Sequence, residues 1–124
     1  MTIMEAIARV DESRHNTCSR EEKIRWLSQL DGKIRREILM THQGDPGEAF
    51  PGYGPDTPGD TVLLVGAPFE DLYLYWLEAQ VCYSQGEFAD HNAAAALYNR
   101  ERSEFEKDYK KNHMPVQRGK RVRF

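Results

Sequence analysis

The sequence predicts an all-α protein: a four-helix, bundle-like domain with a long Gly/Pro-rich loop between helices 2 and 3 and an extended C-terminal tail. Two capping-box patterns precede helix-length segments, apolar residues recur at spacings of three and four, and glycine and proline concentrate between two of those segments. A chain of 124 residues has room for one domain. We expect a helical domain over residues 1–116 and a basic extended tail over residues 117–124.

The first two helices are predicted by how they begin. Thr2 with Glu5, and Ser19 with Glu22, have the spacing at which each side chain can bond the backbone N–H of the other residue. The first helix covers "TIMEAIARVDE". The apolar face of the second helix consists of Ile24, Leu27, Leu30 or Asp31, Ile34 and Ile38.

The loop excursion, residues 43–67, contains six glycines and four prolines. Neither a helix nor a central strand forms at that density, and so long a connection is usually functional or disordered. Because Phe50, Tyr53 and the apolar run 62–65 would anchor it, we expect an ordered loop. We also expect residues 44–66 to contribute to a partner or subunit surface and not to the fold itself.

The aromatic stretch "FEDLYLYWLEAQVCY" is predicted to form the third helix, which Gly86 ends. Its apolar residues form two seams, Phe69, Leu72, Trp76, Ala79 and Tyr83, and Leu74, Leu77 and Val81. Two seams are typical of a central helix that is contacted from more than one direction. Tyr73 and Tyr75 fit neither seam and are candidates for an interface. The fourth helix, roughly residues 87–113, would complete an antiparallel hairpin.

The helices are expected to share one apolar centre. Its predicted members, from the second, third and fourth helices, include Leu27, Ile34, Leu72, Trp76 and Phe105.

Charge is distributed unevenly along the chain, whose net charge is −3. The last eight residues, "QRGKRVRF", carry four basic residues and no acid, which leaves 13 basic and 20 acidic residues, a charge of −7, in residues 1–116. An acidic body argues against a general nucleic-acid coat, which needs a basic face. The tail is expected to order only on assembly, on an edge at residues 61–65 or on a neighbouring subunit. The predicted interface residues are Phe50, Tyr53, Tyr73, Tyr75, Arg118, Lys120, Arg121, Arg123 and Phe124.

No catalytic constellation is visible. The four histidines are scattered, no cysteine pair has zinc-ligand spacing, and the Gly-rich loop lacks the Lys-Ser/Thr of a P-loop. Catalytic, cofactor and metal sites are therefore not predicted, and we expect a protein that is not an enzyme. Cys18 and Cys82 are predicted to be free thiols in a reducing compartment. No apolar run is long enough to span a membrane, and no secretory signal is predicted.

Four segments together resemble the small head–tail connector proteins, also called head-completion or adaptor proteins, of tailed bacteriophages and prophages. The segments are "MTIMEAIARVDE", "EEKIRWLSQLDGKIRREI", "DTVLLVGAPFEDLYLYWLEAQVCYSQGE" and "YNRERSEFEKDYKKNHMP". The resemblance lies in the overall pattern, since no single motif in them is diagnostic by chemistry.

The resemblance implies a virion structural protein that forms a ring beneath the portal through protein–protein contacts. Its expected partners are the portal protein, neck or tail components and further copies of itself, with DNA only as the contents of the channel and no membrane. The expected location is the host bacterial cytoplasm during assembly and then the virion neck. The alternative is a small DNA-packaging or DNA-binding accessory protein that uses the basic tail. Nothing in the sequence supports a third class, a small enzyme or an enzyme-inhibiting module.

Overall fold

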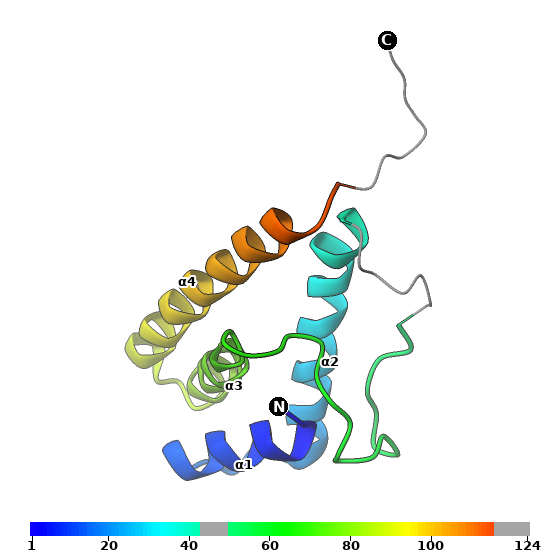
Figure 1. Cartoon of the computed structure of the whole chain (residues 1–124). Coiled ribbons are helices and arrows are strands. Elements are labelled where there is room, and N and C mark those ends of the chain that lie inside the picture. Colours follow the sequence, from blue (N-terminus) through cyan, green and yellow to red (C-terminus); the bar gives the residue numbers. More distant parts are fainter. Residues whose placement is uncertain (43–49, 116–124) are drawn as a thin grey trace.

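The computed structural model describes residues 1–42 and 50–115, and over these residues the fold is all-α (Figure 1). Its elements are α1 (Ile3–Ser13), α2 (Arg20–Glu37), a short 3-10 turn η1 (Leu39–Thr41), α3 (Asp71–Ser84) and α4 (Phe88–Asn112). α3 packs against each of the other three helices, and a tight turn folds α4 back along it. The predicted fold class is therefore confirmed, as is the central position of the third helix.

Both predicted capping boxes form. Thr2 Oγ1 accepts the N–H of Glu5 at 3.1 Å while Glu5 Oε1 accepts that of Thr2 at 2.9 Å. Ser19 and Glu22 cap α2 in the same way. Gly86 follows α3 with φ +76°, a left-handed conformation that glycine adopts without strain, and the chain turns there into α4.

The connecting segment, as we call residues 50–66, supplies hydrogen bonds that α1 needs. The first N–H groups of a helix have no acceptor within it. The N–H of Ile3 donates to Thr61 O at 3.0 Å, and that of Met4 donates to Gly59 O at 2.9 Å. In return, the N–H of Leu63 donates to Met1 O at 2.9 Å. The start of α1 is thus held by the connecting segment.

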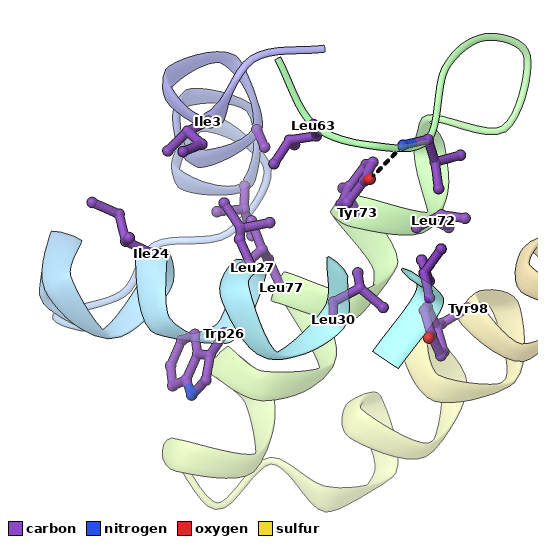
Figure 2. Packing of buried hydrophobic residues seen from close by; sticks show 14 of the residues in the cluster. Ile3, Ile24, Trp26, Leu27, Leu30, Leu63, Leu72, Tyr73, Leu77 and Tyr98 are labelled. Atoms are coloured by element: carbon purple, nitrogen blue, oxygen red, sulfur yellow. Dashed lines mark hydrogen bonds between the residues drawn. The ribbon is translucent and has the colours of Figure 1, made fainter. Parts of the chain in front are cut away.

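The connecting segment also supplies part of the hydrophobic core. Leu63 and Val65 are buried in the same cluster as Leu27 of α2 and Leu72 of α3. Figure 2 shows Leu63 between α1 and the α2–α3 pair. The expectation that residues 44–66 do not contribute to the fold is therefore wrong for the described part, and residues 44–49 lie outside the described residues.

The predicted apolar centre is present with one modification. Leu27, Ile34, Leu72 and Phe105 are all buried, whereas Trp76 is only partly buried. The Trp76 indole N–H donates to the carbonyl of Trp26 at 2.9 Å, and its ring lies 5.1 Å from that of Tyr98. α1 joins the same core through Ile3, Ala6 and Val10.

Candidate interaction surface

A buried carboxylate, that of Asp31, joins α2 to α3 and to the connecting segment. Its Oδ2 accepts hydrogen bonds from the Tyr53 hydroxyl at 2.6 Å and from the Leu64 backbone N–H at 3.1 Å. Its Oδ1 accepts one from the Tyr73 hydroxyl at 2.6 Å. The Tyr73 oxygen in turn accepts the N–H of Val65 at 2.8 Å, the bond drawn in Figure 2. The carboxylate thereby fixes both ends of the connecting segment on the helices.

Burial governs the electrostatics of this cluster. Asp31 is fully buried, and no basic side chain is among its hydrogen-bond partners in the described part of the chain. Burial raises the pKa of Asp31, and the hydrogen bonds from Tyr53, Tyr73 and Leu64 offset only part of that effect. Burial and the Asp31 charge raise the pKa of both phenols above its ordinary value. Two neutral phenols and one backbone N–H therefore stabilise the carboxylate, and the cluster serves to position the connecting segment.

The raised pKa of Asp31 predicts how stability depends on pH. Between the pKa of about 3.9 in the unfolded chain and the higher value in the fold, the native state binds more protons, so this carboxyl lowers the free energy of unfolding as pH rises. The loss is about 1.4 kcal/mol for each unit by which the pKa is raised.

Chemical denaturation of the wild type and of Asp31→Asn across pH 3–8 isolates this contribution, because the amide does not titrate while every other carboxyl is retained. We expect the stability of the wild type to fall relative to that of the variant as pH rises. A difference that stays constant, or that changes in the opposite direction, would show that burial does not dominate at this carboxylate.

Tyr73 does not lie at a surface, so its prediction as an interface residue is wrong. Its side chain is fully buried in the core. The two predicted seams are the sides of α3 on which other helices pack. The connecting segment covers a further side of α3, and this cover buries the Tyr73 ring. Tyr75 is partly buried against the same core.

The other aromatic candidates of the loop are partly buried as well. Tyr53 packs against the core with its hydroxyl bonded to Asp31, and its backbone N–H donates to Ser28 Oγ at 3.0 Å. The Phe50 ring lies edge-on to Tyr53 with centroids 5.2 Å apart, beside Gly32 of α2. Both rings therefore help to attach the connecting segment to α2, and a role for them at an interface stays a prediction.

The predicted tail residues, Arg118, Lys120, Arg121, Arg123 and Phe124, lie outside the described residues. The structure does describe the edge inside the chain on which the tail was expected to pair. Val62 forms an antiparallel bridge with Thr2, and the N–H groups of Leu64 and Val65 donate to the side chains of Asp31 and Tyr73. A strand added to this run would have to displace those side chains, which favours an acceptor surface elsewhere.

An exposed aromatic cluster lies at the hairpin tip, the name used here for residues 83–91, where α3 turns into α4. Tyr83 and Phe88 leave 62% and 57% of their surface exposed, although Tyr83 was predicted to belong to a core seam. The Tyr83 ring lies 5.6 Å from that of Phe88 and 5.3 Å from that of His91. The position of Gly86 is the signal that could have revealed this cluster, since a ring next to a hairpin turn lies where few other elements pack against it.

Acidic side chains lie at the hairpin tip on the side that meets the end of α1. Arg14, just after α1, lies 3.4 Å from Glu87 and 3.3 Å from Asp90, and Glu78 of α3 contributes to the same electrostatic neighbourhood. Three acids and one arginine give these four groups a net charge of −2. A shallow depression beside them is lined by Ser13, Arg14, His15, Gln85 and Glu87. The hairpin tip thus combines exposed aromatic rings with a separate group of charged side chains, around Arg14, whose sum is negative.

Within residues 1–42 and 50–115, no set of three His, Cys, Asp or Glu side chains is arranged to bind a metal ion. Both cysteines are free; Cys82 is buried, and burial raises the pKa of its thiol. Cys18 Sγ lies 3.3 Å from Ser84 Oγ.

No family model matches the chain, and no curated protein or solved structure is significantly similar to it. Within the described ranges, no helix combines the length and the apolar character that crossing a bilayer requires.

Proposed function

We propose that this protein is a head–tail connector, or adaptor, subunit of a tailed bacteriophage or prophage, which forms a ring beneath the portal. The observation that carries the proposal is the resemblance in the sequence of the central hairpin, "DTVLLVGAPFEDLYLYWLEAQVCYSQGE" and "YNRERSEFEKDYKKNHMP". A small all-α body with exposed aromatic rings at one end is compatible with a subunit that acts through protein–protein contacts.

In this role the helical body of each subunit packs against the neighbouring subunits of the ring. The portal protein binds one side of the ring, and a neck or tail component binds the other side. DNA passes through the channel without being read. An acidic body suits that task, because negative charge does not retain DNA. The subunit would be made in the cytoplasm of the host bacterium and remain in the virion neck.

One observation favours a second candidate function, a DNA-packaging or DNA-binding accessory protein. The last eight residues carry four positive charges, which could neutralise phosphates. A body of charge −7 opposes that role, since it repels the same DNA.

Immunogold electron microscopy distinguishes the two candidates. Antibodies against the chain, applied to particles released from induced cells, are expected to label the junction between head and tail. A DNA-packaging accessory protein would instead be absent from finished particles. It would also shift the electrophoretic mobility of short DNA duplexes at physiological salt. Particles without label at the junction, from a preparation in which the antibody detects the free protein, would contradict the connector role.

The basic tail is predicted to contribute to assembly and not to folding. A chain truncated after Met114 lacks the four basic residues of the tail, and we expect a helical protein with wild-type ellipticity whose multimers are lost at concentrations where the full chain forms them. The intact chain should also assemble less well in high salt, because exposed charges are screened. Sedimentation velocity measures both effects. Equal assembly of the two proteins in low and high salt would exclude this role.

A further inference from the structure

The hairpin tip is the feature for which the fold itself gives no reason. Tyr83 and Phe88 stack edge to face, yet each leaves more than half of its surface exposed. Single exposed apolar residues are normal on a protein surface, but a grouped and rigid aromatic pair is typical of a contact with another molecule. The turn is held by the bond from the Glu87 N–H to Cys82 O at 2.9 Å and by His91, whose Nδ1 lies 2.8 Å from Ala79 O.

The charge that the hairpin tip carries beside Arg14 indicates the chemistry of the partner. Glu78, Glu87 and Asp90 outnumber the one basic group among them, Arg14, which already contacts two of the three. A segment that combines arginine with an aromatic side chain fits such a surface, because a guanidinium stacks on an aromatic face and pairs with carboxylates. The C-terminal segment of this chain, "RGKRVRF", has that composition.

The length of α4 excludes the tail of the same molecule as the occupant. α4 has 25 residues, which corresponds to about 37 Å. The chain leaves α4 at the end opposite to the hairpin tip (Figure 1). The nine residues 116–124 span at most about 32 Å when fully extended, so the backbone of Phe124 falls short of Phe88. Arg121, only six residues and at most about 22 Å along the tail, falls short by more than the length of its side chain. The tail that meets a given tip must belong to another copy.

We propose that the hairpin tip of one subunit binds the C-terminal segment of the next, with Arg121, Arg123 and Phe124 contacting Tyr83, Phe88 and the acidic side chains beside Arg14. This contact rests on the proposed connector function and names the surface that joins neighbouring subunits. The contact is heterologous, because it pairs two different surfaces, the tail of one copy and the tip of the next. Repeated from copy to copy, such a contact forms a closed ring when the rotation between neighbouring copies allows closure.

Sedimentation velocity of full-length variants over a range of concentrations tests the contact. The tip variant is Tyr83→Ser with Phe88→Ser, and the tail variant replaces Arg121, Arg123 and Phe124 by serine. Each is expected to raise the concentration of half-assembly at least tenfold, and the two combined should raise it no more than about twofold further, because both remove the same contact. Two control variants should assemble as the wild type does. Tyr83→Phe keeps the aromatic ring at the tip, and Met4→Ser removes an exposed apolar side chain at the N-terminal end of α1, the end opposite to Arg14.

Mixing the two variants gives the sharpest result. The tail of the tip variant can still bind the tip of the tail variant, so we expect a one-to-one heterodimer from two proteins that are monomeric when alone. Circular dichroism and thermal melting confirm that each variant is folded. If the tip variant assembles at the wild-type concentration, or the mixture stays monomeric, the contact is overturned while ring formation by the wild type still supports the connector role. A wild type that never self-associates overturns both.

Discussion

Asp31→Ala is expected to lower the free energy of unfolding by about 3 kcal/mol. The substitution leaves the Tyr53 and Tyr73 hydroxyls and the Leu64 N–H without their acceptor inside the protein. A buried donor that loses its partner costs about 1–3 kcal/mol. The sum is reduced because the carboxylate is itself costly to bury, as its raised pKa indicates. Denaturant unfolding monitored by circular dichroism measures the change.

Tyr53→Phe provides the matched control for this prediction. It removes one of the three hydrogen bonds to Asp31 and keeps the ring that packs against the core, so the expected loss is smaller, about 1.5 kcal/mol. If Asp31→Ala is as stable as Tyr53→Phe, or more stable, the carboxylate does not organise the connecting segment. A wild-type melting curve for Asp31→Ala would contradict the cluster as described.

Leu27→Ala is expected to cost about 3–4 kcal/mol. Leu27 is fully buried among residues of α1, α3 and the connecting segment (Figure 2). Shortening a buried leucine removes its burial and leaves a cavity, and the penalty is largest where the surroundings cannot collapse into the space. Elements from several directions fix the space around Leu27, so little relaxation is expected.

Leu64→Ala is the control for Leu27→Ala, since Leu64 is one of the exposed large hydrophobic residues and its contribution through Asp31 is made by the backbone. Its expected cost is below about 1 kcal/mol. Urea unfolding of the two variants should therefore differ in midpoint and not in slope. Similar midpoints would mean that Leu27 is not central to the core.

The helices were predictable because their signals are local. Thr2 with Glu5 and Ser19 with Glu22 mark two helix starts within four residues of sequence, and Gly86 marks a helix end by the backbone conformation that it permits. The start of α3 was predicted less well: the whole stretch from Phe69 was expected to be helical, but the helix begins at Asp71.

The connecting segment and the hairpin tip were not predictable in the same way, because their environments depend on residues far apart in sequence. Tyr73 is buried because a segment without regular structure covers it, and helical periodicity contains no information about such a cover. Tyr83 belongs to a seam by spacing but lies beyond the packed part of that seam. Asp31 can lie on the apolar face of α2 because three hydrogen-bond donors pair with its carboxylate there. These donors come from residues 22 to 42 positions away, so the local sequence does not reveal them.

Negative-stain electron microscopy of the purified full-length protein, at concentrations where sedimentation shows multimers, tests the connector proposal most directly. We expect closed rings of uniform subunit number, with a central channel wide enough for a DNA duplex. The tip variant, Tyr83→Ser with Phe88→Ser, should show no rings on the same grids. Single subunits at every concentration, or open filaments in place of rings, would contradict the proposal that this protein is a connector subunit.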